Sequence, residues 1–136
     1  MNLAPYPNVQ VRTQSALAAQ LPSADVIYVC VGATHVPAEF LDALAIGGRL
    51  VLPLTPNERL GCMLLVTRKS ATDFAAHIFS TAAFIPCSGA PDDAQSKALA
   101  AALDAGGTDR VRTLRRDHPD ASAWCVGAGW WLSTQQ

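Results

Sequence analysis

Charged residues are scarce in this chain of 136 residues: Asp, Glu, Lys and Arg make up 15 % of it, whereas half of it is apolar. About a quarter of the residues of a soluble domain are usually charged, so we expect a large share of this chain to be buried. Its length predicts a single domain. The net charge of −1 provides no excess of cations. This balance argues against nucleic acid or an acidic membrane surface as a partner.

Cysteine pairs at metal-binding or redox spacing are also absent. Cys30, Cys62, Cys87 and Cys125 form no Cys-x-x-Cys pair, and no histidine stands at ligand spacing, so we expect no metal site. Three of the four lie in apolar runs, where a reduced thiol behaves as a small hydrophobe. The first ten residues do not resemble a signal peptide, and no apolar run is long enough to cross a membrane. The sequence therefore predicts a cytoplasmic protein without a membrane partner.

A glycine-rich nucleotide loop is missing as well. The one Gly-x-Gly in the chain, Gly127-Ala128-Gly129, lacks a third glycine and precedes Trp130-Trp131 rather than a helix. It therefore fails the structural context that such a loop needs, and we interpret it as a tight bend or bulge in a strand.

A strand, a helix and a second strand are predicted between Ala24 and Leu54. The run Val26–Val31 is continuously apolar and rich in β-branched residues, which is typical of a parallel strand covered on both faces. Pro37 suits the first turn of a helix, and Gly47-Gly48 are expected to end it before the next strand at Leu50–Leu52. These elements form a βαβ unit.

The expected site follows from this unit, because ligands of parallel sheets bind outside the carboxyl ends of the strands. Those ends lie around Gly32–His35 and Pro53–Thr55. The alternative for Gly32–His35 is a plain strand-to-helix turn with Thr34 as the cap. His35 is a candidate general base, or else a solvated turn histidine, and no acid that would orient it is identifiable. Cys30 is expected to be a core thiol rather than a nucleophile.

The flanking segments predict further strands and helices. Val9–Arg12 alternates apolar and polar residues and predicts a short strand, and Ser15–Leu21 predicts a brief helix. Leu60–Thr67 and Phe74–Phe84, joined by a polar connection, predict an antiparallel hairpin.

The last part of the chain predicts a helix over Ala94–Ala105, capped by Asp92 or Asp93. Arg110–Arg116 is expected to be an edge strand defended by charge rather than a nucleic-acid site. Residues 123–132 are expected to be one strand interrupted by glycines. At least two of the three tryptophans in this part should be buried; they are Trp124, Trp130 and Trp131.

A family resemblance emerges from several of these motifs together. Asp25–Val29, the small-residue turn after it, the Pro-initiated helix, the run Gly47–Pro53 (GGRLVLP) and the apolar hairpin resemble the second half of class I S-adenosylmethionine-dependent methyltransferases. Within that class they are most similar to the protein-L-isoaspartate O-methyltransferase group. The resemblance implies an α/β fold: a Rossmann-like methyltransferase sheet that lacks its first strands and ends in an antiparallel hairpin.

The same resemblance divides the chain into two parts of one domain, 1–136. Residues 1–86 correspond to a partial methyltransferase core, and residues 87–136 form an appended helix with strands. The family's first strand, its glycine-rich loop and the second strand with its ribose-binding acid have no counterpart here. The resemblance therefore implies S-adenosylmethionine as the cofactor of the family, with weak or no binding by this chain alone.

The resemblance also suggests site residues. Gln14 stands where the family places an acid for the adenine amino group, and a carboxamide can accept that hydrogen bond. Gly32 and Ala33 are the further cofactor-binding candidates, and Thr34, His35 and Pro53 are the substrate-binding candidates. No catalytic residue is identifiable.

Three functions compete at this point. The chain is a partial methyltransferase that is inactive on its own, the cofactor-binding half of a medium-chain dehydrogenase relative, or a non-catalytic interaction module on a methyltransferase scaffold. The first is favoured because Pro53-Leu54 leads into a long apolar hairpin, whereas the dehydrogenases usually have a glycine turn there. The absent strands would leave an unpaired sheet edge, so we expect a homo-oligomer or association with a missing N-terminal half.

Overall fold

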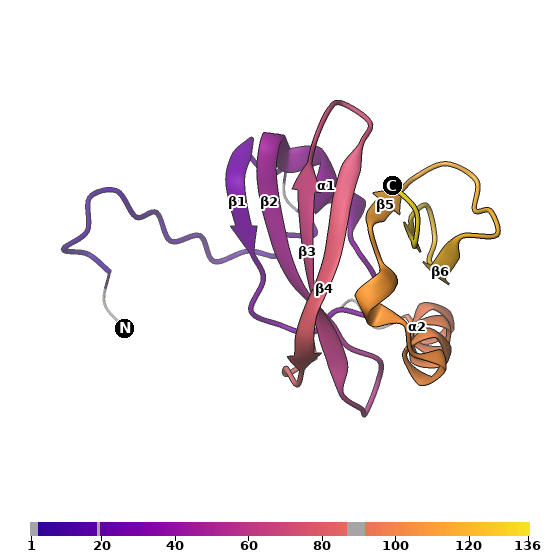
Figure 1. The fold of residues 1–136 in the computed structure, drawn as a ribbon. Helices are drawn as coiled ribbons and strands as arrows, with labels where there is room; N and C mark the ends of the chain where they lie inside the picture. Colours follow the sequence, from indigo (N-terminus) through magenta and orange to yellow (C-terminus); the bar gives the residue numbers. More distant parts are fainter. Residues whose placement is uncertain (1–2, 19, 87–91) are drawn as a thin grey trace.

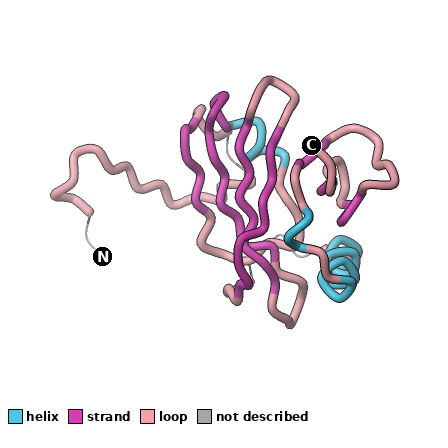
Figure 2. Tube along the Cα trace, in the orientation of Figure 1, coloured by secondary structure: helices cyan, strands magenta, loops and turns pink. Residues whose placement is uncertain are grey.

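The computed structural model describes residues 3–18, 20–86 and 92–136, which form one seven-stranded sheet with two α-helices (Figures 1 and 2). The strands lie in the order β1-β2-β3-β4-β5-β7-β6. The elements are β1 (Ala24–Tyr28), α1 (Ala38–Ala43), β2 (Leu44–Leu54), β3 (Gly61–Arg68), β4 (Phe74–Ala82), α2 (Asp93–Ala105), a 3-10 turn η1 (Thr108–Arg110), β5 (Thr113–Arg115), β6 (Ala123–Val126) and β7 (Trp131–Ser133).

The predicted βαβ unit is confirmed, because β1 and β2 are parallel neighbours joined through α1. Ile27 pairs with Leu50 and Tyr28 with Val51. The predicted hairpin is confirmed as well: β3 is antiparallel to both β2 and β4. The molecule is therefore of the α/β class, with a parallel pair at one end of a mainly antiparallel sheet.

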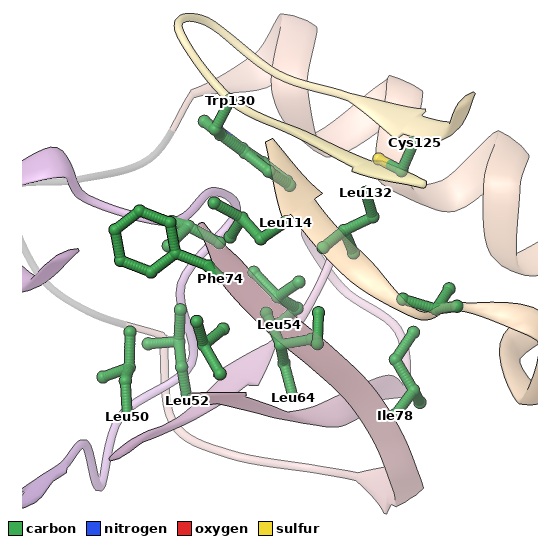
Figure 3. Packing of buried hydrophobic residues seen from close by; sticks show 14 of the residues in the cluster. Leu50, Leu52, Leu54, Leu64, Phe74, Ile78, Leu114, Cys125, Trp130 and Leu132 are labelled. Atoms are coloured by element: carbon green, nitrogen blue, oxygen red, sulfur yellow. The ribbon is translucent and has the colours of Figure 1, made fainter. Parts of the chain in front are cut away.

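The core lies on one face of the sheet, where alternate residues of β2 and β3 point the same way (Figure 3). Leu50, Leu52, Leu54 and Leu64 are fully buried there. The appended part adds to the same cluster through Leu99, Leu114, Cys125, Trp130 and Leu132. Trp130 and Trp131 are 3 % and 1 % exposed, which confirms that at least two tryptophans are buried, and Trp124 packs against the core while partly exposed.

The N-terminal predictions are wrong. Val9–Arg12 is not a strand, and among the described residues of Ser15–Leu21 only residues 16–18 form a turn and none is helical. Figure 1 shows the N-terminal segment leading away from the sheet. A four-residue strand is not stable without a neighbouring strand, and no strand lies beside this segment in the described chain.

The strand Val26–Val31 is shorter and more exposed than predicted. It ends at Tyr28 and occupies the edge of the sheet, and Val26 and Tyr28 are 55 % and 60 % exposed. The prediction that this strand is covered on both faces is therefore wrong. The helix α1 packs on the core face of the sheet, whereas the other face of β1 is open to solvent. Cys30 is exposed rather than a core thiol, whereas Cys62 and Cys125 are buried. Cys87 lies outside the described residues.

Two glycine predictions also need correction. Gly47-Gly48 do not end the helix: α1 stops at Ala43, and both glycines lie inside β2. Gly47 has a φ of +84°, and the pairing of β1 with β2 shifts register beside it, as in a β-bulge. Residues 123–132 form the two-stranded hairpin β6–β7 rather than one interrupted strand, with Gly129 at a φ of +77° in its turn.

The arginine-rich segment Arg110–Arg116, predicted as an edge strand, contains β5, and β5 is not at an edge. It lies between β4 and β7, because the β6–β7 hairpin folds back onto its far side. Two arginines of the segment Arg110–Arg116 are in ion pairs: Arg115, in β5, with Asp117 at 2.6 Å, and Arg116, just after β5, with Asp42 at 2.6 Å.

Candidate functional site

The segment that follows β1 runs along the carboxyl end of β2. Val29 N–H donates to Val51 O at 3.0 Å, Ala33 N–H donates to Pro53 O at 2.9 Å, and Thr55 N–H donates to Ala33 O at 2.9 Å. The two predicted strand ends thus lie side by side. Ala33 and Pro53, predicted to bind cofactor and substrate, are brought together by backbone hydrogen bonds.

The close packing around Gly32 leaves no room for a side chain at this position. Gly32 N–H donates to Ile85 O at 2.9 Å, and a Cβ at this position would lie 2.1 Å from Thr55 Oγ1. Thr55 is buried, so it has little space to move aside. The space next to the Gly32 Cα is therefore filled by Thr55, and the glycine allows this close approach of two strand ends.

Thr34 and His35 form a polar pair at the start of the connection to α1. Thr34 is 5 % exposed, and its Oγ1 lies 3.2 Å from His35 Nδ1 in a hydrogen bond. The N-cap of α1 is Pro37, so Thr34 does not occupy the cap position considered for it. His35 is partly buried rather than a fully solvated turn residue.

A groove of about 690 Å³ lies beside β1, within the range of ligand sites in proteins. His35, Ala33, Pro37 and Phe40 line its end, β1 lines one side, and residues of the segment 15–22 line another. Among the described residues that line it there is no aspartate or glutamate. Gln14 is exposed and precedes the lining residue Ser15 without lining the groove itself.

Asp92 lies near His35, which the sequence does not predict. It is the N-cap of α2, where its carboxylate accepts hydrogen bonds from Gln95 N–H at 2.9 Å and Gln95 Nε2 at 3.0 Å. These hydrogen bonds lower the pKa of Asp92, and the charge of nearby His35 lowers it further. The sequence signalled only the cap, because the approach to His35 arises from tertiary packing.

The start of α2 is held at this end of the sheet by the loop after β2. Asn57 N–H donates to Ser96 Oγ at 2.8 Å, and Asn57 Nδ2 donates to Asp93 Oδ1 at 3.0 Å. The appended helix thereby brings Asp92 toward the strand ends. At this end of the sheet His35 lines the apolar groove, Thr34 is hydrogen-bonded to His35, and Asp92 lies near His35 without lining the groove.

The described ranges contain neither a cluster of metal ligands nor a membrane-spanning helix. Within residues 3–18, 20–86 and 92–136, no group of three or more His, Cys, Asp or Glu is placed to hold a metal ion. In the same part of the chain, no helix combines the length and apolar character needed to span a bilayer.

Comparison with known proteins identifies one family. The family model for protein-L-isoaspartate(D-aspartate) O-methyltransferase (PCMT) matches residues 14–91. A protein-L-isoaspartate O-methyltransferase of Flavobacterium johnsoniae is 42 % identical over 62 residues, which are 46 % of this chain and 28 % of that protein. Protein-L-isoaspartate O-methyltransferase 1 of Rhodopseudomonas palustris is 34 % identical over 84 residues, 60 % of this chain and 34 % of that protein.

The match to these relatives is partial: the chain spans about a third or less of their length. Among solved structures, a Plasmodium falciparum protein assigned as a protein-L-isoaspartate O-methyltransferase, in complex with S-adenosyl-L-homocysteine, aligns with a TM-score of 0.43 and 22 % identity. That alignment covers 48 % of this chain and 28 % of the Plasmodium chain, and it is too distant to support an argument about the site.

Proposed function

Because the matched residues 14–91 are more than half of it, the chain belongs to the protein-L-isoaspartate(D-aspartate) O-methyltransferase family, and we propose that it forms the second half of an S-adenosylmethionine-dependent methyltransferase core. The observation that carries this proposal is the coincidence of the family match with the βαβ unit. The carboxyl ends of that unit hold the segment Gly32–His35 beside a groove.

The proposed substrate is an L-isoaspartyl or D-aspartyl carboxylate of a protein, as the name of the family states. S-adenosylmethionine would supply a methyl group bound to a sulfonium, an electrophile that a carboxylate oxygen can attack directly. A carboxylate is ionised at neutral pH, so its attack requires orientation more than a base. His35, at the groove end, would orient that carboxylate, and Thr34 would hold the imidazole through the hydrogen bond between Thr34 Oγ1 and His35 Nδ1. Pro53 is joined to the lining residue Ala33 by a backbone hydrogen bond.

The groove fits only part of such a cofactor. Its apolar lining, with Phe40 and Ala33, suits one face of a flat ring. The described residues that line it include no carboxylate for ribose hydroxyls or for the methionine amine. We therefore propose that the chain supplies one side of the cofactor site and is inactive on its own. Gln14 would contribute from the segment next to the groove.

Calorimetric titration and a methyl-transfer assay test this proposal. The absence of several convergent hydrogen bonds should weaken binding by a few kcal/mol, on the order of a hundredfold or more in affinity. We expect the chain alone to bind S-adenosylmethionine only weakly and to transfer no methyl group to an isoaspartyl peptide. A dissociation constant in the low micromolar range, or turnover by the chain alone, would overturn the proposal.

A non-catalytic interaction module is the second candidate, and the exposed edge of β1 favours it. The dehydrogenase alternative has no support, since the relatives described above are named as methyltransferases. Binding of S-adenosylhomocysteine at the groove separates the first candidate from the second, because a module without a cofactor role would show none.

A further inference from the structure

Within the described residues no strand lies beside the outer edge of β1, and the segment at Ile85 bonds only beyond the end of β1, where Gly32 N–H donates to Ile85 O. Val29 N–H donates to β2, and since these directions alternate along a strand, the backbone groups of Val26, Tyr28 and Cys30 point away from the sheet. All three residues are exposed, and none is a lysine, a proline or a charged residue that would protect the edge. This edge can therefore accept a further strand.

The same chain contains a segment suited to be that strand. Val9–Arg12 alternates apolar and polar residues, yet it lies outside the sheet with Val9 40 % and Val11 72 % exposed. Its hydrogen bonds are local, as in Val9 N–H donating to Tyr6 O at 3.1 Å and Arg12 Nη2 to Gln10 Oε1 at 3.5 Å. A strand-forming segment and an accepting edge thus occur in one molecule, and they are not paired in the described chain.

The path of the chain separates this segment from the β1 edge of its own molecule. Leu17 and Leu21 pack against the core and line the groove beside β1. From there the chain leads away from its own sheet toward the N-terminus (Figures 1 and 2). The net charge of −1 gives two copies little mutual repulsion.

We propose that Val9–Arg12 of one copy pairs with the β1 edge of a second copy, and that the exchange is reciprocal and closes a two-fold symmetric dimer. The pairing satisfies the outward backbone groups of Val26, Tyr28 and Cys30. It also covers Val9, Val11 and Tyr28 in the same step. The opposite sheet edge, β6, is shorter, with four residues against five in β1.

Sedimentation velocity of the full chain across micromolar concentrations tests the proposal, with the wild type expected as a dimer. Val11→Pro removes a donor N–H from the exchanged strand, and Val26→Lys places a charge at the accepting edge. Each should weaken the dimer roughly tenfold or more. Val11 is exposed and outside the sheet, so its replacement leaves the fold intact. The matched control Val126→Lys, at the opposite edge, should leave the dimer unchanged.

Three results would overturn the proposal. A monomeric wild type would mean that no exchange occurs, or that the segment pairs within its own chain. A dimer sensitive to Val26→Lys but not to Val11→Pro would indicate direct pairing of two β1 strands. A dimer lost with Val126→Lys alone would place the interface at β6. None of these readouts involves the cofactor, so the result is independent of the methyltransferase proposal.

Discussion

Gly32 lies so close to Thr55 that a Cβ on the glycine would come within 2.1 Å of Thr55 Oγ1 and 3.3 Å of its Cγ2. This contact fixes the segment after β1 against the carboxyl end of β2. Because Thr55 is buried, we expect Gly32→Ala to destabilise the protein by about 1–3 kcal/mol, as overpacking does elsewhere.

A double-mutant cycle checks this prediction by urea unfolding. Thr55→Ala removes the atoms that the new methyl group meets, so the combined variant should lose less stability than the sum of the single variants. Additive losses would show that the contact between these two residues is not the cause.

Gln95 should link α2 to the β6–β7 hairpin. Its Oε1 accepts hydrogen bonds from Trp130 Nε1 at 3.0 Å and from Ala128 N–H at 2.9 Å. Gln95→Leu leaves the indole N–H of buried Trp130 without this acceptor, at an expected cost of about 1–3 kcal/mol in unfolding free energy. Lys97→Ala, an exposed position on the same helix, is the matched control. A loss no larger than that of the control would rule out the link.

The cysteines should differ in reactivity. Cys30 is exposed, whereas burial raises the pKa of Cys62 to about 12 and that of Cys125 to about 11. Since the thiolate is the reactive form, iodoacetamide at neutral pH should label Cys30 in the folded protein and spare Cys62 and Cys125. Peptide mapping by mass spectrometry after brief labelling measures this. Equal labelling of all three before denaturant is added would contradict the structure.

Acid should destabilise the hairpin end of the sheet. A hydrogen bond from Arg115 lowers the pKa of Asp117 from its ordinary 3.8, as does one from Trp131. A carboxylate with a lowered folded-state pKa contributes stability above its unfolded pKa, and this contribution is lost as the pH falls through the folded value. The urea midpoint should therefore drop more steeply in the wild type than in Asp117→Asn between about pH 5 and about pH 2. Asp25→Asn, in exposed β1, is the control and should follow the wild type.

The central elements were predictable because local signals agreed. The helix after Pro37, the strand that contains Leu50–Leu52 and the polar connection between β3 and β4 each match the structure. The cap at Asp92 was predictable too, because a carboxylate before an apolar-periodic stretch is a local signal. Each of these inferences needs only a few neighbouring residues.

The remaining features depend on partners that are distant in sequence. Alternation at Val9–Arg12 indicates strand propensity but not the presence of a neighbour, and the structure provides none. β5 was predicted at an edge because nothing in Arg110–Arg116 shows that β7 will pair with it. The approach of Asp92 to His35 likewise follows from how α2 packs against Asn57.

The central claim, that Gly32–His35 forms one side of a methyltransferase cofactor site, is tested most directly by amide chemical-shift mapping with S-adenosylhomocysteine. The account predicts shifts at Gly32, Ala33 and His35, with saturation only well above the low micromolar range. Unchanged shifts there at millimolar ligand, or changes confined to other parts of the molecule, would contradict it.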